Sequence, residues 1–182
     1  AMLGGGEYPS TAIGINLPNA DWIRARYGSK SVTISNIISA YNEAARGNGY
    51  LEEFAIDSET MDMVKKYGDI CDILHTDLHE CLGHGSGKLL KGVDSDSLKA
   101  YGNTIEEARA DLFGLYYMAD VKLIQLGLLP DQDAYKAGYY TFILNGLLTQ
   151  LARIKKGDEI EEAHMRDRAL IARWCYEHGC AD

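Results

Sequence analysis

The segment His79-Glu80-Cys81-Leu82-Gly83-His84 places two imidazoles on either side of a glutamate within a probable helix. Zinc hydrolases often draw two metal ligands and a general base from one helix by the pattern H-E-x-x-H, in which the histidines are four positions apart. Gly83 makes the spacing five in this chain. At about 100° per residue, five steps turn the second side chain about 140° away from the first. The helix must therefore be overwound, bulged or ended inside the segment, and glycine permits such a backbone.

The rest of the chain predicts a mainly α fold. Apolar residues recur at helical spacing in several stretches, and alternating patterns typical of a large sheet are missing. One helix is expected to begin with Thr104 as its N-cap, because Glu107 three positions later completes a capping box. A loop is expected to begin within residues 83–87, which contain three glycines. The expected helices are 35–45, 60–67, 69–82, 104–126, 132–154 and 159–177.

Residues 1–28 predict an irregular or extended segment of the same domain, and residues 29–182 predict the helical domain itself. Two of the three prolines lie in the first segment, around a short apolar run at 12–15 that could form an edge strand. A chain of 182 residues with 46% hydrophobic content is long enough for one core. The start at Ala1-Met2-Leu3, followed by three glycines, indicates that the native N-terminus is not included.

The charge balance argues against one class of partner. The chain has 18 Lys and Arg residues against 27 Asp and Glu residues, a net charge of -9, which argues against nucleic acid as the main partner. It has no apolar stretch of about 18 residues, so we expect no membrane span. Its four cysteines form no C-x-x-C pair, so they indicate neither a disulfide framework nor a thiolate zinc site.

A zinc site built on two histidines needs a third protein ligand. The expected helix 104–126 offers Glu107 and Asp111, which are four positions apart and therefore share a face. One carboxylate could bind the ion while the other accepts the free ring N–H of a ligand histidine. The alternative is that Glu106 and Glu107 are first-turn acids favoured by the helix dipole, with Arg109 and Asp111 on a solvated face.

Four segments resemble the dipeptidyl peptidase III family. Residues 79–89 resemble its H-E-x-x-G-H signature, and residues 106–111, which read E-E-A-R-A-D, resemble its second signature, E-E-x-R-A-E/D. Residues 14–19 and 163–168 resemble family segments that precede and follow these two. Asp111 replaces a glutamate found in some members, and Cys81 stands where others have an aliphatic residue.

The resemblance implies a site for one zinc ion with His79, His84 and Glu107 as ligands. It implies that Glu80 activates the attacking water, which agrees with a carboxylate next to a ligand but pointing away from it. Glu106 and Asp111 would be hydrogen-bond partners of the ligand histidines.

For the substrate, the resemblance implies that His164 stabilises the oxyanion of the tetrahedral intermediate and that Arg168 holds the peptide. Asn16 and Asn19 would bind the peptide beside a strand edge on which it could add as a further strand.

At the level of the whole protein, the resemblance implies a cytoplasmic zinc metallopeptidase that removes dipeptides from the N-terminus of short peptides. Family members are longer and two-lobed, so this chain would be a piece of the helical, metal-bearing lobe, and its partner would be the remainder of the enzyme. Two alternatives stay open: a metal-binding or partner-binding module without useful turnover, and a zinc hydrolase that acts on a non-peptide amide.

Three further features have simpler interpretations. His75 lies four positions before His79 and could pair with it at a metal, but a packed or surface histidine is the more common case. Cys81 is expected to be a small buried hydrophobe. Residues 83–88 resemble a phosphate loop only weakly, because the spacing is one short and no strand precedes them, so nucleotide binding is rejected.

Overall fold

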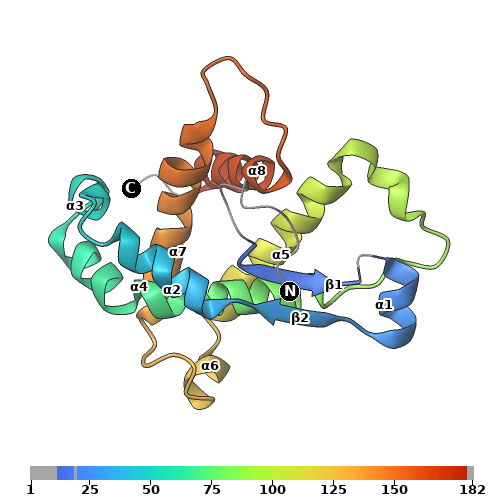
Figure 1. Cartoon of the computed structure of the whole chain (residues 1–182), viewed down its shortest axis with the longest axis horizontal. Helices are drawn as coiled ribbons and strands as arrows, with labels where there is room; N and C mark the ends of the chain where they lie inside the picture. The colour runs from blue at the N-terminus through green and yellow to red at the C-terminus, as the bar shows by residue number, and fades with distance from the viewer. Residues whose placement is uncertain (1–11, 19, 180–182) are drawn as a thin grey trace.

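The computed structural model describes residues 12–18 and 20–179, and within them the fold is mainly α, as predicted (Figure 1). The α-helices are α1 (Asp21–Tyr27), α2 (Ser35–Ala45), α3 (Tyr50–Phe54), α4 (Ser58–Leu78), α5 (Gly102–Met118), α6 (Val121–Gln125), α7 (Ala134–Leu144) and α8 (Ala163–His178). Shorter helical turns of other pitch are η1 (His79–His84), η2 (Ser95–Tyr101), η3 (Asn145–Gln150) and η4 (Leu151–Arg153). None of the described helices is both long enough and apolar enough to cross a bilayer.

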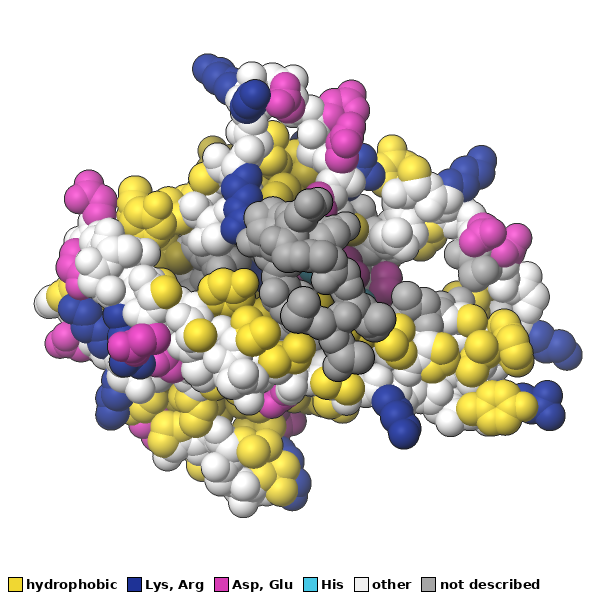
Figure 2. Space-filling model, viewed as in Figure 1, with side chains coloured by type: hydrophobic (Ala, Val, Ile, Leu, Met, Phe, Trp, Pro, Cys, Tyr) yellow, Lys and Arg dark blue, Asp and Glu magenta, His cyan; other side chains and the backbone are white. Residues whose placement is uncertain are grey.

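A two-stranded antiparallel ribbon precedes the helices. Strand β1 (Gly14–Leu17) lies where an extended run is expected, and it pairs with β2 (Lys30–Thr33) in a register that sets Gly14 opposite Thr33. Helix α1 connects the strands. Both α1 and β2 were missed by the sequence reading, because a helix of seven residues and a strand of four have too little periodicity to be recognised. Figure 2 shows hydrophobic side chains at the surface around α1 and the ribbon. The exposed large apolar residues of these elements include Leu17, Trp22, Tyr27 and Val32.

Helix α4 corrects the prediction of two helices at 60–67 and 69–82. It runs unbroken through Gly68, where a Cβ would make ordinary contacts of 3.4 Å with Val64 and 3.5 Å with Thr141 of α7, so this glycine does not interrupt the helix. Asp57 caps the start by accepting a hydrogen bond from the Thr60 N–H at 2.7 Å.

The distortion expected near Gly83 is confirmed. After Leu78 the helix continues as the π-helix η1, which spans both histidines of the motif. A π-turn adds one residue per turn, so a five-residue spacing returns His84 to the side of His79. The reason for glycine is nevertheless different from the expected one, because a Cβ on Gly83 would lie only 2.7 Å from the Cα of Ala110 in α5. The missing side chain lets η1 approach α5 closely.

Helix α5 departs from the prediction at both ends. Thr104 is not the N-cap: the helix begins at Gly102, directly after the 3₁₀ turn η2, and Thr104 is buried inside it. The helix also ends at Met118 instead of continuing to 126. Asp120 then starts α6 by accepting a hydrogen bond from the Lys122 N–H. This side-chain cap divides into two helices the stretch 104–126, whose apolar pattern predicted one.

The C-terminal half follows the predicted outline with shifted ends. The expected helix 132–154 is α7, continued by η3 and η4. The last helix begins later than expected, because Glu162 is the cap of α8 and accepts a hydrogen bond from the Met165 N–H at 3.0 Å.

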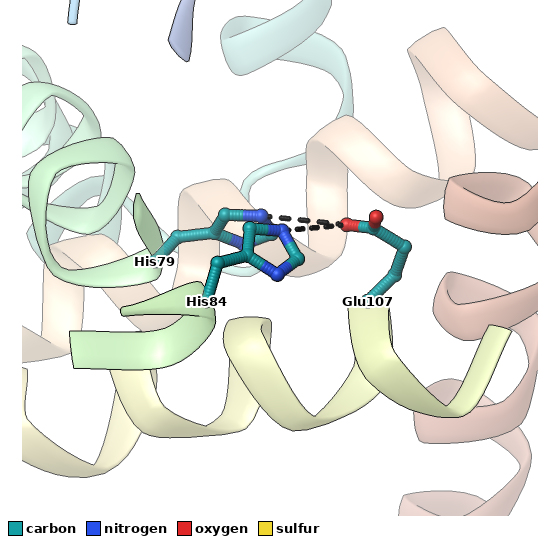
Figure 3. Close-up of side chains that lie close together, drawn as sticks. All are labelled: His79, His84 and Glu107. Carbon is teal, nitrogen blue, oxygen red and sulfur yellow. Dashed lines mark ion pairs between the residues drawn. The ribbon is translucent and has the colours of Figure 1, made fainter. Parts of the chain in front are cut away.

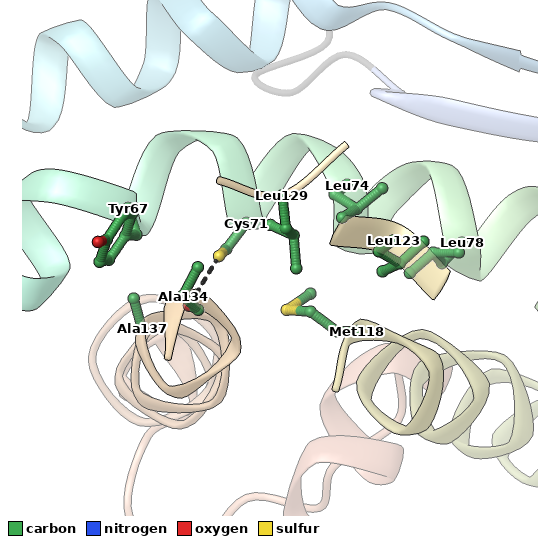
Figure 4. Packing of buried hydrophobic residues seen from close by; sticks show 9 residues of the cluster. All are labelled: Tyr67, Cys71, Leu74, Leu78, Met118, Leu123, Leu129, Ala134 and Ala137. Carbon is green, nitrogen blue, oxygen red and sulfur yellow. Dashed lines mark hydrogen bonds between the residues drawn. The ribbon is translucent and has the colours of Figure 1, made fainter. Parts of the chain in front are cut away.

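An apolar core lies where α4 packs against α5, α6 and α7 (Figure 4). Small residues permit the close contact: Cys71, Ala134 and Ala137 are fully buried, and the Cys71 thiol donates to the Ala134 carbonyl at 3.1 Å. The buried members are Tyr67, Cys71, Leu74, Leu78, Met118, Leu123, Leu129, Ala134 and Ala137. Since the core ends at Leu78, it fixes the direction in which η1 leaves α4.

Candidate metal centre

Two elements that lie against each other, η1 and α5, bring three potential metal ligands together (Figure 3). The Nε2 atoms of His79 and His84 each lie 3.4 Å from Oε2 of Glu107. The two imidazole rings are nearly perpendicular, with centroids 4.6 Å apart. One ligand atom from each of the three residues lies within 4.8 Å of the others.

These spacings fit a tetrahedral ion. Zinc holds histidine nitrogens and carboxylate oxygens at about 2.0–2.2 Å, so two ligand atoms on a tetrahedron are about 3.3–3.6 Å apart. The two nitrogen–oxygen distances of 3.4 Å fall in this range and exceed an ordinary hydrogen bond. Oε2 of Glu107 is buried, and among the described residues no well-aligned hydrogen bond satisfies it, although the Nε2 atoms of His79, His84 and His164 lie 3.2–3.4 Å away. A cation would therefore stabilise this oxygen more directly than these neighbours do.

Carboxylates on α5 hold the other nitrogen of each ring. Nδ1 of His79 lies 2.7 Å from Oδ1 of Asp111, and Nδ1 of His84 lies 3.0 Å from Oε1 of Glu106. A carboxylate accepts a hydrogen bond from the Nδ1–H group, which leaves Nε2 as the nitrogen that can bind a metal. The alternative of a solvated acidic face is wrong, because Asp111 is only 2% exposed and both glutamates lie beyond the first turn of α5.

Arg109 holds the carboxylate of Glu106 in place and links it to Ser86, in the loop that follows η1. Its guanidinium donates to both carboxylate oxygens of Glu106, at 2.8 and 2.6 Å, and to the hydroxyl and carbonyl oxygens of Ser86 at 3.1 and 3.3 Å. Two parallel bonds to one carboxylate fix its orientation. Arg109 thus ties the carboxylate behind His84 to the loop that follows η1.

The site without its ion is a cluster of paired charges. Burial disfavours the charged form of His79 and His84, but hydrogen bonds and charge from Asp111, Glu106 and Glu107 outweigh it and raise both pKa values to about 9. Although burial alone would raise them, the neighbouring histidines lower the pKa of Glu107 below its usual range, and His84 and Arg109 lower that of Glu106 to about 2. In the ion-free protein, protons therefore occupy the imidazoles that a metal would need.

Glu80 is next to a ligand but points elsewhere. It is 6% exposed, and its Oε2 atom has no hydrogen-bond donor among residues 12–18 and 20–179. Burial raises the pKa of its carboxyl group, although the nearby histidines oppose the shift. A buried carboxylate without a donor is a stronger base than an exposed one.

The two candidates on α8 each contact one acid of α5. Nε2 of His164 is 3.2 Å from Oε2 of Glu107, and hydrogen bonding to that carboxylate raises the pKa of His164 to about 10. Nε of Arg168 is 3.2 Å from Oδ2 of Asp111, its guanidinium stacks on the Phe142 ring, and it donates to the Phe142 carbonyl at 3.1 Å. His164 is half exposed, whereas Arg168 is mostly buried.

Asp167 is a buried acid that the sequence did not reveal. Its side chain is 0% exposed, and neither oxygen has a hydrogen-bond donor in the described part of the chain. Burial and the negative charge of Asp111 raise its pKa, which favours the protonated carboxyl group, a form that can donate a hydrogen bond. No pattern signals this, because an acid between Arg166 and Arg168 on a helix normally faces solvent.

The predicted substrate residues are only partly described. Asn16 is 8% exposed, and its amide nitrogen donates to the Ser31 hydroxyl at 2.7 Å, the Glu80 carbonyl at 3.2 Å and the Ser29 hydroxyl at 3.3 Å. Asn19 lies outside the described residues. Ser31 was missed because β2 was missed.

His75 and Cys81 lie near the metal centre but are not part of it. Nε2 of His75 lies 3.4 Å from the Asp111 carbonyl, its ring packs edge-on against Phe142, and burial lowers its pKa to about 4, so it is a packed neutral histidine. Cys81 is exposed, not buried as expected, since η1 turns it away from α5.

Comparison with known proteins agrees with the resemblance. The model of a family described as peptidase family M49 matches residues 7–99, more than half of the chain. Dipeptidyl peptidase 3 of Nematostella vectensis is 26% identical over 200 aligned positions, and that of Homo sapiens is 28% identical over 200; each alignment covers 91% of this chain. The solved structure of DPP III from Caldithrix abyssi superposes with a TM-score of 0.67 at 28% identity and covers 92% of this chain.

These relatives are much longer than the chain. The alignments cover 26% of the Nematostella and human proteins and 30% of the Caldithrix chain. The chain therefore spans about a quarter of the curated relatives that it matches.

Proposed function

Because this chain belongs to peptidase family M49, we propose that the protein carrying it is a zinc metallopeptidase that releases dipeptides from the N-terminus of short peptides. The observation that carries the proposal is the convergence of His79, His84 and Glu107, with 3.4 Å from each Nε2 to the shared carboxylate oxygen. This chain supplies the metal-bearing part.

In this proposal Glu80 moves the proton. A zinc ion held by the two histidines and Glu107 would polarise the peptide carbonyl and lower the pKa of the attacking water. Oε2 of Glu80, which has no donor among the described residues, is available to accept a proton and to deliver it to the leaving amine. Burial keeps this carboxylate basic.

The residues of α8 and β1 would hold the peptide. His164 is half exposed and lies beside Glu107, so its ring N–H can donate to the oxyanion that forms on the attacked carbonyl. Arg168 is anchored by Asp111 and Phe142 and would contact the peptide from there. Strand β1 has one partner among the described strands, so its other edge can pair with an extended peptide.

The remainder of the enzyme would be the main macromolecular partner. Two observations support this: the chain spans about a quarter of its relatives, and it exposes large apolar side chains on the ribbon and α1. Surface of this kind is usually covered by another protein part.

Glu80→Gln in the protein that carries this chain tests the proposal. The substitution removes the base but keeps the shape, so we expect hydrolysis of a dipeptidyl arylamide to fall about 100- to 10,000-fold with one zinc ion still bound per chain. Glu53→Gln, on the exposed surface of α3, is the matched control and should retain activity. Wild-type protein that binds no stoichiometric zinc, or full hydrolysis by Glu80→Gln, would falsify the proposal.

A further inference from the structure

The ribbon of β1 and β2 packs on η1 at Glu80 itself. The Glu80 carbonyl accepts a hydrogen bond from the Ser31 hydroxyl at 3.1 Å and from the Asn16 side-chain amide at 3.2 Å. Ser31 and Asn16 are also bonded to each other at 2.7 Å, so they form one unit across the two strands. Both strands therefore hold the main chain of the same residue.

This carbonyl belongs to the distorted turn. It also accepts the Gly85 N–H at 3.0 Å, a bond to the residue five positions later, which closes the π-turn. Carbonyl groups in a widened turn are less completely used by the helix, and they can take side-chain donors from a neighbouring element. The π-turn that brings His84 to the metal thus also gives the ribbon its point of attachment.

The side chain of Glu80 meets the same ribbon at Gly14. A Cβ on Gly14 would lie 2.5 Å from Oε1 and 2.8 Å from Cγ of Glu80, closer than such atoms ever approach. The φ angle of Gly14 is not in the left-handed region, so backbone conformation does not require glycine here. The requirement is space: the carboxyl group of Glu80 occupies the volume that a side chain would fill.

We propose that Gly14, Asn16 and Ser31 are positioning residues for Glu80. Asn16 and Ser31 hold its main chain, and Gly14 leaves the space in which its carboxyl group lies. Oε1 is then packed against the strand, while Oε2 stays free of donors from the described residues. The inference rests on the proposed function, in which Glu80 is the base. Asn16 then has a role that does not depend on substrate. Ser31, which the sequence did not single out, has the same role.

Steady-state kinetics of the zinc-loaded protein test the inference. Gly14→Ala should lower kcat about 100-fold, since displacing a reacting group by about 1 Å has an effect of this size. Ser31→Ala removes one of several bonds and should lower kcat about 3- to 10-fold. KM, the inhibition constant of a product dipeptide and the zinc content should stay at wild-type values in both variants, because binding and metal ligands are untouched.

Matched variants separate positioning from general damage. Ser31→Thr keeps the hydroxyl and should restore kcat to within about twofold of wild type. Lys30→Ala, exposed on β2 and without a bond to Glu80 or Asn16, should behave as wild type. In a Glu80→Gln background Ser31→Ala should cause no further loss, because the residue that it positions is already inactive.

The results distinguish failure of the positioning role from failure of the proposed function. If Glu80→Gln abolishes hydrolysis but Ser31→Ala and Gly14→Ala keep wild-type kcat, or change only KM, the positioning role is wrong while the proposed function stands. If Glu80→Gln keeps full activity, the proposed function fails first. Should Gly14→Ala not fold, the Ser31 variants decide alone, and a loss in Ser31→Ala that Ser31→Thr does not restore overturns the inference.

Discussion

The helical segment 58–84 passes from an apolar core into a charged site between two adjacent residues. Leu78 is the last core residue of α4, and His79 is the first residue of η1 and of the metal centre. The core has tightly packed small and apolar side chains, including Met118 at 1% exposure. The site has buried acids and imidazoles whose pKa values are all displaced by one another.

The difference separates two kinds of stabilisation. Burying a large apolar side chain contributes about 1.5–3 kcal/mol regardless of pH or metal. Buried charges gain little net stability, since desolvation offsets their attraction, so their arrangement suits binding more than folding. We therefore expect substitutions in the core to change stability without changing the metal, and substitutions in the site to do the reverse.

Glu107→Ala should give the largest effect, and this effect should be almost wholly a loss of zinc affinity. The substitution removes the carboxylate that two imidazoles share, and we expect zinc affinity to fall more than about 100-fold, beyond the usual loss for an outer hydrogen-bond partner. Competition with a chromophoric chelator measures it, with Glu53→Ala on α3 as the control. Tight zinc binding by the Glu107 variant would show that the ion is held elsewhere.

Met118→Ala should give the opposite pattern. It leaves a cavity between α4, α5 and α7, and we expect the free energy of unfolding to fall by about 2–5 kcal/mol. Chemical denaturation measures this loss, and zinc affinity of the folded protein should match wild type. Leu112→Ala, exposed on the same helix, should cost far less. A matching loss of zinc affinity in Met118→Ala would break the separation of the two regions.

Gly83→Ala tests the boundary between the core and the metal centre. Stability and zinc affinity should change together there. The added Cβ would meet the backbone of Ala110 at 2.7 Å and force η1 away from α5, so we expect a loss of about 1–3 kcal/mol in stability. Zinc affinity should fall too, because His84 moves with the turn. Gly102→Ala is the matched control: its Cβ would have 4.0 Å to the nearest atom, Leu98 Cβ, and neither measurement should change.

The smallest effect should come from pH. In the zinc-free protein the pKa values of His79 and His84 are about 9, above an unfolded value of about 6.5. Their contribution to stability is therefore complete below about pH 6.5 and is lost as pH rises through about 9. Thermal midpoints of zinc-free protein should therefore fall as pH rises between these values, in wild type and Met118→Ala alike. A midpoint that rises over this range would contradict the assigned charge pairs.

The sequence predicted the site better than the fold around it. Spacing alone required a distorted turn at Gly83 and put Glu107 and Asp111 on one face, because both follow from helix geometry. A role for His164 at the site came only from the resemblance, and its approach to Glu107 was not predicted, since contacts between distant helices leave no periodic signal. No sequence pattern indicated Asp167 or Ser31. Asp167 is buried only because α8 docks on α5, and Ser31 is placed only by the pairing of β2 with β1.

The errors in the fold have local causes. Thr104 has the residue types of a cap, yet η2 delivers the chain to a helix that has already begun at Gly102. Asp120 caps α6 and divides an apolar pattern that would suit one helix. Gly68 suggests a break where the helix continues, because α4 packs along α7 through this stretch. In each case a neighbouring element decides between two locally acceptable conformations.

The three candidate ligands all come from residues 79–107, on two helical elements that are consecutive apart from one loop and η2. Contacts between nearby parts of a chain form with little loss of loop entropy, and they form early in folding. We expect metal capture to need only η1 and α5, before α8 docks with His164 and Arg168. An early bound ion would then act as a staple around which the later, long-range contacts of the active site assemble.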